Sequence, residues 1–140
     1  VGFNYRMTNI QAAIGCAQLE TITQAIARNQ ELSGRYEKIF KGESRIRFQK
    51  KAPGRNKITW LVSALVGRER RDAFLASLIR NSIDARPFFY PLSTMPIYRK
   101  YTFSNMNSIA VSESGINLPT NHHVTNADIK KMKDILGELD

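Results

Sequence analysis

The stretch GFNYRMTNIQAAIGCAQLE, residues 2–20, decides the fold because it marks the start of a long helix. Thr8 and Gln11 have the spacing of a capping box, in which each side chain binds the other residue's backbone N–H. Apolar residues then recur at the spacing of one helical face until Gly42, a residue typical of helix C-termini. They are Ile10, Ile14, Ala17, Ile22, Ile26, Leu32, Tyr36, Ile39 and Phe40. This pattern predicts a helix of about 30 residues.

A helix of this length is unusual in a small domain, because helices of globular proteins average about 11–12 residues. Either it breaks, with Asn29 and Gly34 as the candidate positions, or it reaches beyond the domain toward a partner. We therefore divide the chain into a long-helix segment, residues 1–42, and a small domain, residues 43–140.

The rest of the sequence alternates short strand-like and helical patterns. ITWLVSALV (58–66) is rich in β-branched and aromatic residues and predicts a buried strand. Further extended segments are expected at 45–49, after a turn at 82–86, and at 116–120; helices are expected at 69–81, 105–114 and from Thr125 onward. The last helix should bury Ile129, Met132, Leu139 and one of Ile135 and Leu136. This order predicts one α+β domain with a small, mostly antiparallel sheet and helices packed on one face.

The composition is that of an ordinary globular protein, with a formal net charge of +9. This charge points to anionic partners: nucleic acid, an anionic membrane surface or phosphorylated small molecules. No apolar stretch reaches the roughly 18 residues needed to span a bilayer. The single Cys16 has no partner for an internal disulfide, which fits a reducing compartment. We expect it to be a small buried side chain on the apolar side of the helix.

The segment before the Thr8 cap contains a candidate anion site made of Gly2, Asn4 and Arg6. The N–H groups and the dipole of a helix start favour an anion such as phosphate. The Asn4 amide can donate to a phosphate oxygen, Arg6 can pair with phosphate or carboxylate, and Gly2 allows close approach of the backbone. The alternative is an ordinary loop that enters a capped helix, and the residues by themselves favour this alternative.

A second unusual stretch is RPFFYP (86–91), in which five ring-bearing residues follow an arginine. It is too rich in proline for a central strand. A rigid aromatic loop of this kind can line a pocket, where Tyr90 offers a hydroxyl and Arg86 a fork for a carboxylate. The alternative is aromatic packing beneath a loop, and the residues favour neither.

Other groups that could carry chemistry point to ordinary structural roles. His122 and His123 are adjacent, so their side chains diverge, and we expect no metal site. Ser93, Cys16 and the histidines show no spacing typical of a nucleophile and its base. The basic residues are scattered along the chain without a nucleic-acid-binding motif, so we expect neither a nucleic-acid nor a membrane partner.

Three ordered segments resemble one family: GFNYRMTNIQAAIGCAQLE (2–20), DARPFFYPLSTMPIY (84–98) and GINLPTNHHVTNADIKKMKDIL (115–136). They are similar to the DegT/DnrJ/EryC1/StrS family of pyridoxal-phosphate-dependent sugar aminotransferases, which have the type I, aspartate aminotransferase-like fold. The resemblance implies that this chain is the C-terminal portion of such an enzyme. The Schiff-base lysine and the acidic partner of the pyridine nitrogen would lie upstream, so no catalytic residue is expected here and the chain alone should be inactive.

The resemblance also implies roles for individual residues. Asn4 matches the asparagine that reaches the cofactor phosphate of the other subunit in a homodimer. Arg6, Arg86 and Tyr90 match positions near substrate or phosphate, and we expect Arg86 to bind the carboxylate of the amino donor. Ser93 stands where many family members have a histidine, so substrate contact at this position should differ.

The wording RPFFYPL resembles the branch related to perosamine synthases, whose members aminate a nucleotide-linked 4-keto-6-deoxy sugar. This implies a cytoplasmic enzyme of O-antigen biosynthesis that takes the amino group from glutamate through pyridoxal 5'-phosphate. Two other interpretations of the residues are kept: a basic binding module for nucleic acid or an anionic surface, and a structural domain whose long helix serves dimerisation.

Overall fold

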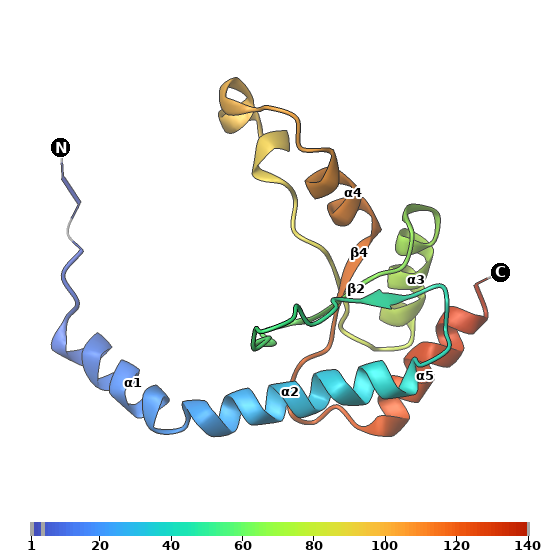
Figure 1. The fold of residues 1–140 in the computed structure, drawn as a ribbon, viewed down its shortest axis with the longest axis horizontal. Coiled ribbons are helices and arrows are strands. Elements are labelled where there is room, and N and C mark those ends of the chain that lie inside the picture. Colours follow the sequence, from blue (N-terminus) through green and yellow to red (C-terminus); the bar gives the residue numbers. More distant parts are fainter. Residues whose placement is uncertain (1, 4, 140) are drawn as a thin grey trace.

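The computed structural model describes residues 2–3 and 5–139, and its fold is α+β (Figure 1). Within these residues the sheet has four strands in the order β1-β2-β4-β3, and all neighbours are antiparallel. The strands are β1 (Arg47–Phe48), β2 (Val62–Leu65), β3 (Arg86–Pro87) and β4 (Gly115–Leu118). The helices are α1 (Asn9–Glu20), α2 (Ile22–Ile39), α3 (Arg68–Arg80), α4 (Met106–Ser114) and α5 (Asn126–Gly137), with 3-10 helices η1 (Leu92–Thr94) and η2 (Pro96–Tyr101). The predicted fold class is confirmed.

The two central strands, β2 and β4, decide which side chains face the helices. Their register pairs Ala64 with Ile116 and Ser63 with Asn117. Ala64 and Ile116 are buried in the hydrophobic core. Because successive residues of a strand point to opposite faces, Ser63 and Asn117 lie on the other face, which we call the polar face of the sheet. β3 is an edge strand, where Pro87 is tolerated although it lacks an N–H.

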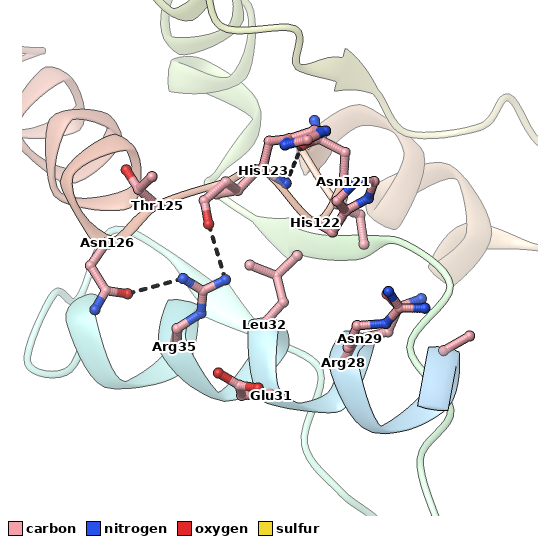
Figure 2. A pocket seen from close by; sticks show the side chains of 13 residues that line it. Arg28, Asn29, Glu31, Leu32, Arg35, Asn121, His122, His123, Thr125 and Asn126 are labelled. Carbon is pink, nitrogen blue, oxygen red and sulfur yellow. Dashed lines mark hydrogen bonds between the residues drawn. The ribbon is translucent and has the colours of Figure 1, made fainter. Parts of the chain in front are cut away.

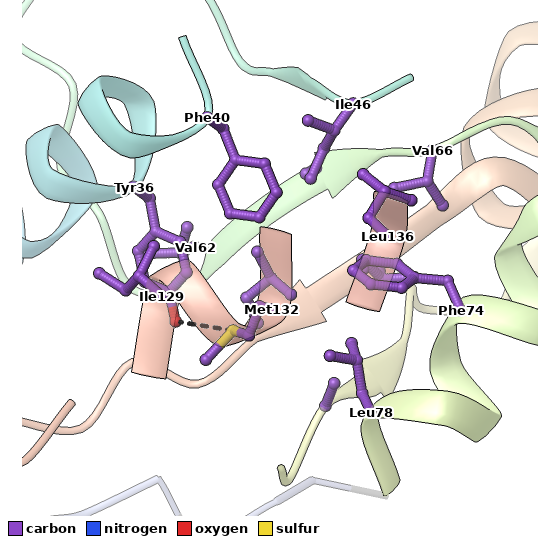
Figure 3. Close-up of a cluster of buried hydrophobic side chains, with 14 of the residues drawn as sticks. Tyr36, Phe40, Ile46, Val62, Val66, Phe74, Leu78, Ile129, Met132 and Leu136 are labelled. Carbon is purple, nitrogen blue, oxygen red and sulfur yellow. Dashed lines mark hydrogen bonds between the residues drawn. The ribbon is translucent and has the colours of Figure 1, made fainter. Parts of the chain in front are cut away.

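The core lies between the sheet and helices α2, α3 and α5 (Figure 3). Tyr36 of α2, Phe74 of α3 and Leu136 of α5 have no exposed surface. The Tyr36 hydroxyl donates a hydrogen bond of 2.9 Å to the Pro119 carbonyl, which ties the segment after β4 to α2. Burial raises the pKa of Tyr36 above its ordinary range, so this hydroxyl stays protonated and remains a donor.

The predicted capping box of Thr8 and Gln11 is present, and Thr125 and Asp128 form a second one, which is why α1 and α5 begin where they do. In α5 the Thr125 N–H donates to the Asp128 carboxylate at 2.8 Å, and the Asp128 N–H donates to the Thr125 hydroxyl at 3.2 Å. The Thr125 hydroxyl also donates to this carboxylate at 2.7 Å, and this bond together with the one from the Thr125 N–H lowers the pKa of Asp128. In α1 the Thr8 N–H donates to the Gln11 side chain at 2.8 Å. The inner face of α5 also follows the prediction: Ile129, Met132, Ile135 and Leu136 are buried, and Leu139 is partly buried.

The predicted long helix is two helices, and the break falls at Thr21 rather than at Asn29 or Gly34. The Thr21 N–H and hydroxyl both donate to the Gln18 carbonyl at 3.3 Å, which ends α1. The β-branched run from Thr21 to Thr23 also lowers helix propensity there. Among the helices that the structure describes, none is both long and apolar enough to cross a membrane.

The exposure of α1 corrects a second prediction. None of its residues is buried, and Figure 1 shows it extending away from the sheet. Cys16 is therefore exposed, not buried, because no other element of the described chain packs on this helix. Ile10 and Ile14 are likewise exposed, so only the C-terminal part of the predicted apolar stripe, in α2, contributes to the core.

The strand expected at 58–66 is shorter than predicted. Only Val62–Leu65 pairs as β2, and Trp60 is 72% exposed. The backbone before β2 is bound to α2 instead: the Asn29 amide donates to the Thr59 carbonyl at 3.1 Å, and the Gln30 amide donates to the Lys57 carbonyl at 3.2 Å.

The Glu43–Arg45 pair in the turn after α2 gives a pH-dependent prediction. The Arg45 guanidinium donates to both Glu43 carboxylate oxygens at 2.9 Å, and its backbone N–H donates at 3.0 Å. These hydrogen bonds lower the pKa of Glu43 from 4.5 to about 2. Because the folded-state pKa is depressed, the stabilisation is present above pH 4.5 and is lost as the pH falls toward about 2.

We therefore expect Glu43→Gln to lower the free energy of unfolding by about 1 kcal/mol at pH 7 and by much less near pH 2. Urea unfolding at both pH values measures this difference. Glu69→Gln is the control, because the Glu69–Arg70 pair is exposed and should change stability by less than about 0.5 kcal/mol. Equal effects of Glu43→Gln at both pH values would contradict the assignment.

Candidate functional site

The polar face of the sheet carries a pocket of about 590 Å³, which we call the sheet pocket. It is formed by the segment before β2, by β3 and its flanks, and by β4 with the residues after it. Its lining includes Trp60, Asp84, Arg86, Phe89, Asn117 and Asn121. These residues are far apart in the sequence and meet because β2 and β3 both pair with β4.

Asn117 holds the base of the sheet pocket together. Its side-chain oxygen accepts a hydrogen bond of 2.7 Å from the Ser63 hydroxyl, and its amide donates to the Pro87 carbonyl at 3.3 Å. It thus connects all three strands around the pocket while being only 6% exposed. Asn117 was not predicted as a site residue; its signal in the sequence is an amide within the otherwise apolar segment INL (116–118).

Arg86 and Tyr90 both line a second pocket of about 560 Å³ beside the first. Leu92 and Met95 also line this loop pocket. Arg86 is exposed, and its guanidinium lies 3.3 Å from the Asp84 carboxylate. Tyr90 is 71% exposed. Both side chains can therefore meet a ligand, with the guanidinium suited to a carboxylate or phosphate and the phenol able to donate a hydrogen bond.

Ser93 lies in η1, and its hydrogen bonds connect the aromatic loop to the residues before α4. Its hydroxyl accepts a hydrogen bond from the Asn105 amide, and its carbonyl accepts one of 3.1 Å from the Thr102 hydroxyl. It lines neither the sheet pocket nor the loop pocket. Its position fixes the return of the loop toward α4.

The candidate anion site before α1 is not part of this cluster. Asn4 lies outside the described residues. Arg6 is exposed, and Figure 1 shows the N-terminal segment far from the aromatic loop. The Thr8 side chain is already occupied by its capping box. The structure therefore separates Arg6 from Arg86, Tyr90 and Ser93.

A third pocket, of about 650 Å³, lies between α2 and the loop before α5 (Figure 2). Arg35 closes one side by donating to the Val124 carbonyl at 3.0 Å and to the Asn126 side chain at 3.4 Å. The expectation that the His122 and His123 side chains diverge was wrong, because their ring centroids lie 4.0 Å apart. Within residues 2–3 and 5–139, no three His, Cys, Asp or Glu side chains are grouped to hold a metal ion.

The profile of the DegT/DnrJ/EryC1/StrS aminotransferase family matches residues 1–136. A GDP-perosamine synthase of Caulobacter vibrioides is 36% identical over 99% of this chain and 39% of its own length. The chain thus spans about two fifths of that relative.

Solved structures agree on the fold. The sugar aminotransferase CalS13 of Micromonospora echinospora superposes with a TM-score of 0.83 at 19% identity, over 98% of this chain and 37% of that one. The PLP form of the protein Spr1654 of Streptococcus pneumoniae gives 0.80 at 23% identity, over 96% and 37%. Members of the family are pyridoxal-phosphate-dependent transferases. From its sequence match and its fold, this chain belongs to the DegT/DnrJ/EryC1/StrS aminotransferase family.

Proposed function

We propose that this chain is the C-terminal part of an enzyme that transfers an amino group from glutamate to a nucleotide-linked 4-keto-6-deoxy sugar. The observation that carries the proposal is the convergence of Arg86 and Tyr90 on one pocket of a chain related to GDP-perosamine synthase. Such a substrate brings two anionic phosphates, and the donor brings carboxylates, which suits the net charge of +9. In this proposal the enzyme is a cytoplasmic homodimer that serves O-antigen biosynthesis.

The described residues do not by themselves provide a complete pyridoxal phosphate site. No lysine lines the sheet pocket, the loop pocket or the pocket beside α2. Lys131 and Lys133 instead donate to the Asn81 and Ile39 carbonyls at 3.2 and 2.8 Å. We propose that the lysine comes from the part of the enzyme that this chain does not span. When bound, the cofactor supplies the electron sink for the chemistry.

The chain's own residues would bind and orient. Arg86 would hold a carboxylate or phosphate through its guanidinium fork, and Tyr90 would donate from its hydroxyl. Ser93 would act indirectly, by stabilising the loop that carries Arg86 and Tyr90, because its hydroxyl is held by Asn105. Asn4 would serve the cofactor phosphate of the other subunit. Arg6, which lies apart from this cluster within one chain, would contact substrate or phosphate there, and residues 1–42 would form the contact segment between subunits.

The proposal is tested with the full-length enzyme, loaded with pyridoxal phosphate. Incubation with glutamate and a GDP-linked 4-keto-6-deoxy sugar should yield the amino sugar nucleotide, detected by mass spectrometry, together with 2-oxoglutarate. Binding of DNA or anionic vesicles without amine transfer would instead favour the basic binding module. Absence of both would favour the structural dimerisation domain.

Arg86→Ala should weaken the apparent affinity for glutamate or the nucleotide sugar about 10- to 100-fold, since a hydrogen bond to a charged group contributes roughly 1.5–3 kcal/mol. Steady-state kinetics with each substrate varied in turn shows which of them depends on the arginine. Arg68→Ala is the matched control, because Arg68 is exposed and paired with Glu113 at 3.2 Å, away from both pockets. Equal KM values for both variants would remove Arg86 from the site.

A further inference from the structure

The sheet pocket contains a pair of stacked aromatic rings that the proposed function leaves unassigned. The Trp60 and Phe89 rings are nearly parallel, at 11°, with centroids 6.1 Å apart. Phe88 meets Phe89 edge-on at 5.9 Å, which fixes the orientation of the Phe89 ring. The contact with Phe88 thus holds one ring of the Trp60–Phe89 pair, and the pair forms one wall of the sheet pocket.

The pair does not serve the hydrophobic core of this domain. Trp60 is 72% exposed and Phe89 is 57% exposed, and neither belongs to the core cluster. A tryptophan ring is the largest flat apolar surface that a protein offers, and leaving it in water forgoes the free energy of its burial. A flat ligand that covers the Trp60 ring would recover this free energy of burial.

The other walls of the sheet pocket suit a flat ligand with polar edges and an anionic tail. Asp84 supplies acceptor oxygens, Asn121 supplies a side-chain amide, and Arg86 supplies a guanidinium. Nucleoside diphosphates have this chemistry. Their bases stack on aromatic side chains and form hydrogen bonds at their edges, and their phosphates pair with arginine. A sugar ring could pack on such a face only through its C–H groups, whereas a base matches the flat face of an aromatic ring with its own π-face.

We propose that Trp60, supported by Phe89, is the stacking platform for the nucleobase of the nucleotide-linked substrate. This inference rests on the proposed function and adds the place of the base and a residue that contributes to nucleotide affinity. Arg86, which lines the same pocket, would then pair with the diphosphate.

The test uses the full-length enzyme and measures binding of GDP and of inorganic pyrophosphate by calorimetry. Trp60→Leu should weaken GDP binding roughly 5- to 150-fold, the loss expected for one stacked base, and leave pyrophosphate binding unchanged. Trp60→Phe keeps a flat ring and should recover most of the affinity. Phe103→Leu is the matched control, because Phe103 is 83% exposed and lines neither pocket, and it should bind GDP like the wild type.

The possible outcomes distinguish a failure of the stacking proposal for Trp60 from a failure of the proposed function. If the wild type aminates a GDP-linked keto sugar and Trp60→Leu keeps its GDP affinity, the assignment of Trp60 as the stacking platform is wrong. The proposed function is then retained. Equal losses for GDP and pyrophosphate, or the same loss in Trp60→Phe, would mean that Trp60 packs against the rest of the enzyme, which also overturns the platform. A wild type that binds no nucleotide and transfers no amine overturns both.

Discussion

Replacing Gly115 by alanine should lower the free energy of unfolding by up to roughly 3 kcal/mol, the upper range for forcing an extra methyl group into a packed site. A Cβ at this position would lie 2.7 Å from the Val111 carbonyl oxygen and 2.8 Å from the Phe88 Cβ. The φ of −94° is accessible to any residue, so the cost is steric rather than conformational. The neighbours cannot yield easily, because the Gly115 carbonyl also accepts the Phe88 N–H at 3.0 Å.

Equilibrium urea unfolding of Gly115→Ala measures this cost. Gly34→Ala is the matched control: Gly34 lies within α2, and an added Cβ would meet nothing within 4 Å. Because alanine is the better helix former, we expect Gly34→Ala to stabilise the chain by about 0.5–1 kcal/mol. The close packing of α4, β4 and the aromatic loop at Gly115 would be disproved if the two variants changed stability equally.

Phe74→Ala should destabilise the chain by about 3–5 kcal/mol, since the ring is lost and a cavity remains. Phe74 has no exposed surface and lies where α3 meets the sheet and α5 (Figure 3). A loss of this size is a large fraction of the roughly 5–15 kcal/mol that stabilises a typical domain. The midpoint of urea unfolding should therefore fall sharply while the slope of the transition is unchanged.

Ile79→Ala on the same helix is the control for Phe74→Ala. Ile79 is 58% exposed, so its truncation should cost no more than about 0.5–1 kcal/mol. Since both variants shorten a side chain of α3 to the same methyl group, the difference between them reports burial rather than helix propensity. Similar losses in the two variants would contradict the placement of α3 against the sheet.

Much of the fold was predictable from the sequence because its signals are local. Thr8 and Thr125 meet their capping partners within three residues, so both helix starts could be identified without any tertiary contact. The apolar spacing of α3 and α5 likewise depends only on helical geometry. Arg86 and Tyr90 line one pocket because a short loop joins them, whereas the sequence left a pocket-lining loop and plain aromatic packing equally open.

The predictions that were wrong depended on contacts beyond the local chain. Asn29 and Gly34 were the candidate positions for a helix break, yet α2 continues through both, and the Asn29 amide is occupied by the Thr59 carbonyl. Cys16 was expected to be buried, but an apolar helical face is buried only if another element covers it. Whether one does is a property of the assembled structure rather than of the spacing.

The sequence by itself determined the fold class, the helix starts, the aromatic loop and the family. Periodicity, capping and motif order can be identified from the sequence without any tertiary contact. Only the tertiary structure decided that Trp60 stacks on Phe89 and that Asn117 joins Ser63 to Pro87. These contacts span tens of residues and exist because β2 and β3 pair with opposite edges of β4 in one register. A shift of one residue in that register would turn Asn117 into the core and separate the residues of the pocket.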